Sequence, residues 1–389
     1  MSGEVKKKIL IFTNIFPCDT RPNAGFYIFE QVRRLKKHYD VRVIVGHPRN
    51  IFSCKKSLMQ KTSFEAIEIY QPSYYTMPKI GVLASGWSYY MSTAGLIEEI
   101  HKEFKFNMVI SYWTYPEGHA ALKVAKKYNV PLMIRPRGSD INVFLDNKWL
   151  ASRVYNVLNQ TDYILPNTEH MKNRIIGMGV EKDRVSFQSN GIDAAEFYPI
   201  AKDQAREQLE LSLDTKIVLF VGSFKDIKGI PYYLNAIKML DTQEYMNLNF
   251  IFLGEGKYKS DIIKLSSELR HVSVSIPGDI THTRLNVWMS AADLLCLPSL
   301  NEGCPNVLLE SLACGLPVVA SDVGGIPEII NHEDLGILFE AKNSEAIAGA
   351  IKEGLTRKWD SAKLLNRIKN QSWDNVVDVL HQECERLMK

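Results

Sequence analysis

The feature of this sequence that most constrains its fold is a repeated pattern in which a short apolar run is followed by an amphipathic stretch. Several of the runs are apolar throughout rather than alternating, which is typical of parallel strands buried on both faces. The strands expected on this basis are Lys8–Ile15, Val41–Gly46, Met108–Tyr112, Pro131–Arg135, Tyr163–Pro166, Val185–Gln188, Ile217–Gly222, Asn249–Gly254, Val272–Pro277, Leu294–Pro298, Pro317–Ser321 and Gly336–Phe339. Helical patterns separate them, as in Phe26–Lys37, Ile230–Leu240 and Val307–Cys314. The sequence therefore predicts an α/β protein with right-handed crossovers between parallel strands.

The length of 389 residues indicates two to three domains, at roughly 150 residues for each domain. The alternation of strands and helices pauses near Ala194–Asp203. We therefore expect two Rossmann-like, doubly wound parallel-sheet domains over residues 1–195 and 196–371 that face a central cleft, and a C-terminal helix over residues 372–389 that crosses back to the first domain. Open α/β sheets bind ligands at the carboxyl ends of their strands, so the cleft is the expected site.

Charge and cysteine content exclude several classes of protein. There are 47 Lys and Arg against 44 Asp and Glu, a net charge of +3, which excludes nucleic-acid binding through bulk positive charge. The six cysteines form no C-x-x-C pair, and we interpret them as reduced thiols of a cytoplasmic protein. The apolar run Ile9–Phe12 is too short for a signal peptide or a membrane span. We expect a cytoplasmic protein that at most sits at the inner face of a membrane.

The strongest local signal lies in residues 298–310, where a strand ends and a helix begins. Glu302 and Glu310 are separated by seven residues, and Gly303 permits close approach of a ligand to the backbone. Pro305 suits a first helical turn, whose N–H groups can bind the oxygens of a ligand. A carboxylate accepts hydrogen bonds from sugar hydroxyls. The alternative is an ordinary helix start with a solvent-exposed glutamate.

Two other strand-to-helix turns carry residues suited to phosphate. Lys228 lies in the turn of residues 221–229 and could neutralise a diphosphate, although it could equally be a solvated loop lysine. Gly25 precedes the helix that begins at Phe26 and is a plausible phosphate cradle.

Polar residues also follow the expected strands at 108–112 and 131–135. His119 comes after the first of these strands, and Arg135, Arg137 and Asp140 come at or after the end of the second. Two arginines, an aspartate and a histidine at strand ends indicate a pocket for an acceptor or a sugar. The alternative for His119 is a histidine that is satisfied at a helix start.

Three familiar signatures are absent from the sequence. There is no Asp-x-Asp of the metal-dependent sugar-nucleotide transferases, no P-loop and no G-x-S-x-G nucleophile elbow. Gly254 and Gly256 lack a third glycine at the spacing of a dinucleotide fingerprint. We therefore expect neither a metal ion nor a cofactor.

Taken together, the chain resembles the retaining, nucleotide-sugar-dependent glycosyltransferases of group 1, which have the GT-B fold. The segments that carry the resemblance are Ala24-Gly25, Trp113-x-Tyr115-Pro116-Glu117-Gly118, Arg137-Gly138-Ser139-Asp140, Asn190-Gly191-Ile192-Asp193, Val221-Gly222, Lys228-Gly229, Gly254-Glu255-Gly256, Glu302-Gly303-Cys304-Pro305, Glu310 and Gly324-Gly325-Ile326-Pro327-Glu328. The first-domain segments look most similar to the branch that builds bacterial surface polysaccharides, including teichuronic-acid-type enzymes. The resemblance implies that the first domain binds the acceptor and the second binds the nucleotide sugar.

The resemblance also implies roles for individual residues. Glu302 would hold donor-sugar hydroxyls, Glu310 the ribose and Lys228 the leaving diphosphate, which the Gly25 turn would also contact. The donor-binding residues implied in this way are Gly25, Gly222, Ser223, Lys228, Gly254, Gly278, Ile280, Glu302, Gly303, Cys304, Asn306, Val307 and Glu310. The implied acceptor-binding residues are Tyr112, Trp113, Arg137 and Asp140, and the implied catalytic residues are Glu302, Lys228 and His119.

The sequence departs from the family pattern at three positions. Ser223 stands where a basic residue is expected, and Lys225 or Arg137 could compensate for the missing charge. Tyr112 and Arg137 stand where the family often has histidine, so His119 becomes the nearest substitute for that side chain.

The function expected from the resemblance is metal-independent transfer of a hexose, with retention, from a nucleotide-diphosphate sugar, with a UDP-sugar favoured. The expected acceptor is a saccharide, which can be lipid-linked, in bacterial surface polysaccharide synthesis. The basic end of the first helix, at residues 33–38, and the aromatic residues Trp87, Tyr89 and Tyr90 could dock on a membrane surface. The alternatives are an inactive nucleotide-sugar-binding subunit and a sugar-nucleotide epimerase or phosphorylase of the same fold.

Overall fold

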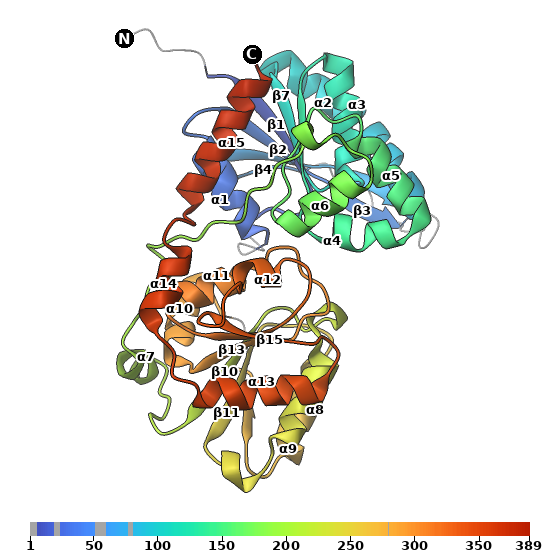
Figure 1. The fold of residues 1–389 in the computed structure, drawn as a ribbon. Helices are drawn as coiled ribbons and strands as arrows, with labels where there is room; N and C mark the ends of the chain where they lie inside the picture. Colours follow the sequence, from blue (N-terminus) through green and yellow to red (C-terminus); the bar gives the residue numbers. More distant parts are fainter. Residues whose placement is uncertain (1–5, 19–23, 51–59, 77–80, 279) are drawn as a thin grey trace, which may run out of the picture. The chain divides into compact units, whose positions relative to one another are not determined.

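The computed structural model describes residues 6–18, 24–50, 60–76, 81–278 and 280–389. The chain divides into two compact units, which are described separately. Unit 1 comprises Met1–Asn190 together with Trp373–Lys389, and unit 2 comprises Gly191–Ser372. Each unit contains a predominantly parallel sheet that is covered by helices on both faces (Figure 1). The predicted α/β class with two doubly wound sheets is therefore confirmed.

Unit 1 contains a seven-stranded sheet. Its strands in spatial order are β4 (Gln60–Phe64), β5 (Ile67–Gln71), β2 (Asp40–Val45), β1 (Lys8–Thr13), β7 (Met108–Tyr112), β8 (Leu132–Arg135) and β9 (Tyr163–Ile164). Only β4 runs antiparallel to its neighbour. A separate parallel pair is formed by β3 (His47–Asn50) and β6 (Ser73–Thr76). The helices of eight residues or more are α1 (Phe26–Leu35), α2 (Ser85–Phe104), α3 (Glu117–Tyr128), α5 (Lys148–Leu158), α6 (Glu169–Gly177) and α15 (Trp373–Leu387), and the short α4 is Ser139–Asn142.

Both faces of this sheet are buried because successive side chains of a strand point to opposite sides. In β1, Leu10 and Phe12 pack into the core under α2 and α3, whereas Ile9 and Ile11 pack into the core under α1 and α15. Figure 1 shows these two helix pairs on opposite sides of the strands. Because both faces of β1 are buried, the strand is apolar at consecutive positions, which is the pattern seen in the sequence.

The last helix, α15, belongs to unit 1 although it follows the whole of unit 2 in the chain. Leu380 and Cys384 are fully buried in the same core as α1. Glu385 accepts a hydrogen bond from the Tyr39 hydroxyl at 2.8 Å and pairs with Lys7 at 2.7 Å. Apolar contact and polar contacts together hold α15 on unit 1.

Unit 2 contains a six-stranded sheet in which every neighbouring pair is parallel. Its strands in spatial order are β12 (Ser273–Ser275), β11 (Leu248–Leu253), β10 (Lys216–Val221), β13 (Leu294–Leu297), β14 (Val318–Ser321) and β15 (Gly336–Phe339). Its helices are α7 (Lys202–Gln208), α8 (Ile230–Met239), α9 (Lys259–Glu268), α10 (His282–Ala291), α11 (Asn306–Ala313), α12 (Ile326–Ile329), α13 (Ser344–Thr356) and α14 (Ser361–Ile368). Helices α8, α9 and α13 cover one face, and α10, α11, α12 and α14 cover the other.

Some elements differ from the prediction. The expected strand Val185–Gln188 is absent, and Val185 makes only an isolated bridge to Ile164. The β3–β6 pair and the β4–β5 hairpin were not predicted. Of the helices in the described part of the chain, none is both long enough and apolar enough to cross a membrane.

Candidate functional site

The predicted residues of unit 2 gather at the carboxyl edge of its sheet, where β10 and β13 end. Lys228 lies in a single 3-10 turn, Asp226–Lys228, after β10, and its ammonium group forms an ion pair with the carboxylate of Glu302 in the loop after β13. The hydroxyl of Ser299, which is fully buried, donates to the same Glu302 oxygen at 2.6 Å. The structure therefore brings Lys228 and Glu302 together and fixes one oxygen of the carboxylate.

Two glycines allow the Glu302 loop to be held from two sides. At Gly229, with a φ of +66°, a Cβ would lie 1.9 Å from the carbonyl oxygen of Pro298. At Gly324, with a φ of +54°, a Cβ would lie 2.0 Å from the carbonyl oxygen of Glu302. The amide of Leu300 also donates to the carbonyl of Ile227 at 2.7 Å. Backbone packing, rather than side chains, positions this loop.

The second predicted glutamate, Glu310, has a histidine partner. Its Oε1 lies 3.4 Å from Nε2 of His282, whose Nδ1 lies 3.2 Å from an oxygen of Glu196. Burial lowers the pKa of His282, but the contacts with the Glu196 and Glu310 carboxylates outweigh burial and raise it to about 9. Neither His282 nor Glu196 was predicted. The only signal was that His282 lies two residues after Ile280, which was predicted to bind the donor.

The remaining predicted donor residues of unit 2 lie in turns along the same edge. Gly254 approaches Gly222 so closely that a Cβ would lie 2.0 Å from the Gly222 carbonyl oxygen. Ser223 is half-buried, and Lys225, its possible substitute, is exposed. Gly278 has a φ of +98°, and Ile280 packs against the core beside α10.

Helix α11 begins at this edge, directly after the Glu302 loop. Pro305 caps it in an extended conformation, with a φ of −72° and a ψ of 111°. Gly303 and Cys304 precede the cap, and Asn306 and Val307 form the first turn. The N–H groups of such a turn favour negatively charged ligand oxygens.

The predicted residues of unit 1 follow its own strands. Gly25 caps α1 with a φ of +68°, and a Cβ there would lie 2.8 Å from the carbonyl oxygen of Ile15 just after β1. His119 lies in the first turn of α3, where burial lowers its pKa, with smaller contributions from Lys123 and Arg153. Its ring meets Tyr115 edge to face at 6.1 Å.

Trp113 and Asp140 lie at the junction between β7 and the turn after β8. Trp113 has a φ of 110°, a strained conformation for a bulky residue and one that is enriched at functional sites. Asp140 is fully buried and accepts hydrogen bonds from the amide and hydroxyl of Thr114 and from the amides of Arg137 and Gly138, at 2.9–3.0 Å. Its carboxylate therefore shapes the two turns.

The other two predicted acceptor residues, Tyr112 and Arg137, are buried in unit 1. The Tyr112 hydroxyl donates to Gln31 of α1 at 3.1 Å. The Arg137 guanidinium lies over the rings of Tyr27 and Tyr112, at 4.8 and 5.0 Å. Arg135 also lies against the Tyr112 ring, at 5.6 Å, and it is one of the two strand-end arginines that indicated an acceptor or sugar pocket.

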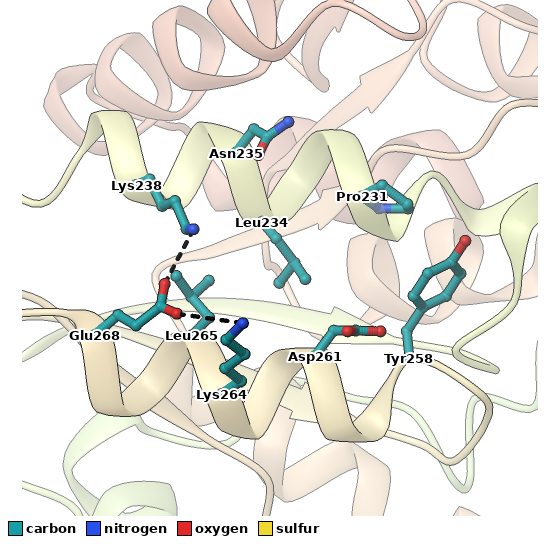
Figure 2. A pocket seen from close by; sticks show the side chains of 9 residues that line it. All are labelled: Pro231, Leu234, Asn235, Lys238, Tyr258, Asp261, Lys264, Leu265 and Glu268. Atoms are coloured by element: carbon teal, nitrogen blue, oxygen red, sulfur yellow. Dashed lines mark ion pairs between the residues drawn. The ribbon is translucent and has the colours of Figure 1, made fainter.

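A surface hollow of about 350 Å³ lies elsewhere, between α8 and α9 of unit 2. Figure 2 shows side chains of the two helices facing each other across it, with Glu268 paired to Lys238 at 3.1 Å and to Lys264 at 4.0 Å. None of the predicted site residues lines this hollow. The hollow therefore lies apart from the candidate site.

No cluster in the described part of the chain has the three or more His, Cys, Asp or Glu side chains that could hold a metal ion. In unit 2 the cationic and hydrogen-bonding groups are those of Lys228 and the start of α11, and in unit 1 they are those of the start of α1 and the buried arginines. Each set by itself suits an anionic or hydroxyl-bearing group of a ligand.

Two family models match the chain, one for each unit. Residues 24–196 match glycosyltransferase family 4, and residues 201–372 match glycosyl transferases group 1. Each match contains the predicted residues of its unit.

Curated relatives are similar over most of the chain. A putative teichuronic acid biosynthesis glycosyltransferase, TuaC of Bacillus subtilis, is 26% identical over 88% of each chain. A D-inositol 3-phosphate glycosyltransferase of Pseudarthrobacter chlorophenolicus is 26% identical over 69% of this chain and 67% of the relative.

Solved structures share the fold at low identity. Sucrose-phosphate synthase from Thermosynechococcus elongatus has a TM-score of 0.77 at 18% identity, covering 98% of this chain and 99% of that one. HepE of Anabaena in complex with UDP-glucose has a TM-score of 0.72 at 16% identity, covering 98% and 100%. These similarities support the architecture and leave the substrate to be argued from the site.

Proposed function

The chain belongs to the group 1 glycosyltransferases of the GT-B fold, which transfer a sugar from a nucleotide sugar, and we propose on that premise that it is a retaining, metal-independent hexosyltransferase. We further propose that a UDP-sugar is its donor and that its acceptor is a saccharide, which can be lipid-linked, in the synthesis of a bacterial surface polysaccharide. The observation that carries the proposal is the Lys228–Glu302 pair supported by Ser299 at the edge of the unit 2 sheet.

This pair supplies the chemistry that donor cleavage needs. As the bond between the sugar C1 and the diphosphate oxygen breaks, negative charge grows on the diphosphate and positive charge grows on the sugar ring. Lys228 would stabilise the diphosphate, and the α11 N-terminus would add N–H groups, so that oriented charges replace a metal ion. The acceptor hydroxyl would attack the same face of the sugar and pass its proton to the departing phosphate oxygen.

Glu302 would hold the donor sugar while Lys228 holds the diphosphate. Its carboxylate can accept hydrogen bonds from sugar hydroxyls, and Ser299 together with the loop contacts keeps it in one orientation. Glu310 would accept from the ribose hydroxyls. Its contact with His282 would orient that carboxylate.

The acceptor site is proposed for unit 1, where Trp113, Arg137 and Asp140 lie at the ends of β7 and β8, with His119 in α3 close by. Two relatives are named as acting in teichuronic acid synthesis and on an inositol phosphate, which fits a polar, hydroxyl-bearing acceptor. The strained backbone of Trp113 supports this proposal, because such strain is enriched at functional sites.

A membrane surface is a further proposed partner. This proposal rests on the exposed apolar residues of α2 rather than on the basic end of α1. Trp87 and Met91, one helical turn apart on α2, are 60% and 53% exposed. By contrast, Arg33 pairs with Glu30, and Lys37 pairs with Asp374. Interfacial binding needs an exposed apolar face, which α2 offers.

The first test is ligand binding in the presence of EDTA. Thermal unfolding is measured with UDP, GDP, ADP, TDP and CMP, and one diphosphate should raise the melting temperature clearly, because a ligand at about 100 times its Kd stabilises by roughly 2.7 kcal/mol. UDP is the expected ligand. Failure of all five nucleotides would contradict the donor site.

The second test is transfer by variants of the site. Lys228→Ala and Glu302→Ala should lower turnover by about a hundredfold or more, as expected when a preorganised electrostatic contact is lost. Glu333→Ala is the matched control, because Glu333 is exposed and pairs with Arg357 away from the predicted site residues. Near-normal transfer by both site variants would reject the assignment, and nucleotide binding without any transfer by the wild type would favour a non-catalytic binding subunit.

A further inference from the structure

Two arginine side chains lie buried side by side in unit 1, beneath α1. Arg135, the last residue of β8, is fully buried, and Arg137, two residues later, is 7% exposed. Their guanidinium carbons lie 5.6 and 5.0 Å from the ring centre of the same residue, Tyr112. Two cations therefore share one small, largely dry region that reaches the surface at Arg137.

Most of the hydrogen-bonding capacity of these arginines is unused. Nη1 of Arg135 donates to the side-chain oxygen of Gln31 at 2.6 Å, and Nη1 of Arg137 donates to that of Asn190 at 3.2 Å. Among the residues that the structure describes, Nε and Nη2 of both arginines have no partner, and neither side chain forms an ion pair. Each guanidinium has five N–H donors in a planar fork, so most of the donors of both arginines are buried and unmatched among the described residues.

Among the described residues, the neighbouring groups do not supply the missing negative charge. Gln31 and Asn190 are neutral amides, and Tyr112 donates its hydroxyl proton to Gln31. The buried carboxylate of Asp140 is directed to four N–H and O–H donors in the turns rather than to a guanidinium. Burial lowers the pKa of Arg135 to about 10, as expected for a cation without a counter-charge.

A buried charge is costly unless it is paired, and two adjacent cations also repel each other. We propose that Arg135 and Arg137 form a subsite for an anionic group, a phosphate or a carboxylate, of one of the substrates. The planar forks of two guanidiniums match the oxygens of such groups. Only the assignment of the group to a glycosyl donor or acceptor rests on the proposed function. The two possible sources are a charged group on the acceptor and the diphosphate of the donor.

The test measures thermal unfolding of the full chain with inorganic phosphate and with glucuronate, and glucose serves as the uncharged comparison. Both anions should stabilise the wild type, and glucose should not. Arg137→Gln and Arg135→Met should raise the Kd for each anion at least tenfold, which corresponds to about 1.4 kcal/mol of binding free energy. Lys126→Gln is the control, because Lys126 is an exposed cation of the same unit that bonds to Gln160, and it should respond as the wild type does.

A purely structural role for the arginines predicts different results. If they only support the fold, Arg135→Met should destabilise the protein and phosphate should leave the wild type unchanged, and this result would overturn the subsite. If the arginines form an anion subsite, Arg135→Met should leave the melting temperature of the ligand-free protein unchanged or raise it, because the substitution removes an unpaired buried charge. Equal stabilisation of the wild type and both variants by phosphate would place the anion elsewhere and would also overturn the proposal.

A repeat with saturating UDP separates the two sources. An effect of phosphate that persists, and that still depends on Arg137, identifies a subsite for the acceptor, whereas an effect that UDP abolishes identifies the donor diphosphate. UDP binding without transfer would reject the proposed function and leave the anion subsite intact. Loss of the anion effect in both variants, with UDP binding retained, would support the subsite independently of transfer.

Discussion

Gly324, in the turn after β14, lies directly against the backbone of Glu302, so that a Cβ on Gly324 would be 2.0 Å from the Glu302 carbonyl oxygen. The contact joins two loops that leave neighbouring strands of the unit 2 sheet. The position of the Glu302 carboxylate therefore depends partly on glycine, which has no side chain, at position 324, 22 residues later. Gly229 makes the same kind of contact with Pro298 on the other side of the loop.

The substitution Gly324→Ala should therefore lower the free energy of unfolding by about 2 kcal/mol, because the residue must keep a positive φ and the loop must move. It should also lower transfer, since Glu302 moves with the loop. Gly349→Ala in α13 is the control, because a Cβ there meets no atom within 4 Å and alanine favours a helix interior by about 0.5–1 kcal/mol. Urea denaturation distinguishes the two, and a Gly324→Ala variant as stable as Gly349→Ala would contradict this account.

The sheets were predictable because their strands carry a local signal. A strand buried on both faces, such as β1 or β10, must be apolar at every position, and such a run is visible without knowledge of its neighbours. The pair β3–β6 gives no such signal, because His47–Asn50 and Ser73–Thr76 are largely polar and are recognisable as strands only once they pair with each other. Pairing of distant segments is set by the tertiary fold.

In the candidate site, too, some features were recognisable from the local sequence and others are set only by tertiary packing. Lys228 and Glu302 could be proposed because their turns resemble those of a known family. The partner of Glu310 could not, because His282 and Glu196 lie 86 residues apart and meet only after α10 packs in place. Arg135 could be placed at a strand end from the sequence, but its lack of a carboxylate partner among the described residues is a property of the packed structure alone.

His282 gives a pH-dependent stability that can be measured. Its folded pKa of about 9 exceeds its ordinary value of 6.5, chiefly because Glu196 and Glu310 outweigh burial. The contribution to stability is therefore fully present below about pH 6.5 and is lost as the pH rises through about 9. The difference in unfolding free energy between the wild type and His282→Gln should be about 1–2 kcal/mol larger at pH 6 than at pH 10. This magnitude allows for partial screening of the charge pairs by solvent.

The control for this pH dependence is His332→Gln, because His332 is exposed and pairs only with Asp334 among the contacts described. Chemical denaturation at several pH values gives the required free energies for both variants. A difference between the wild type and His282→Gln that stays constant across this range would show that His282 is not charged in the folded protein.

The docking of α15 should be worth a large part of the stability of unit 1. Leu380 is fully buried in the core shared with α1, and Leu380→Ala should lower the free energy of unfolding by about 2–5 kcal/mol through lost burial and a cavity. Gln382→Ala on the exposed side of the same helix should change it by less than about 0.5 kcal/mol. A small loss for Leu380→Ala would mean that unit 1 is stable without its C-terminal helix.

Glu117, at the start of α3, gives a pH dependence of the same direction as His282 but in a lower pH range. It is 1% exposed, neither carboxylate oxygen has a partner among the described residues, and burial raises its pKa to about 8. Because the folded protein holds this proton more tightly than the unfolded chain, wild-type stability should fall as the pH rises from about 4.5 to 8. Glu117→Gln cannot ionise, so its stability relative to the wild type should rise over this range by up to about 1.4 kcal/mol per pH unit. Glu98→Gln, at an exposed position, should show no such rise, and equal pH profiles for Glu117→Gln and the wild type would mean that Glu117 has a charged partner in solution.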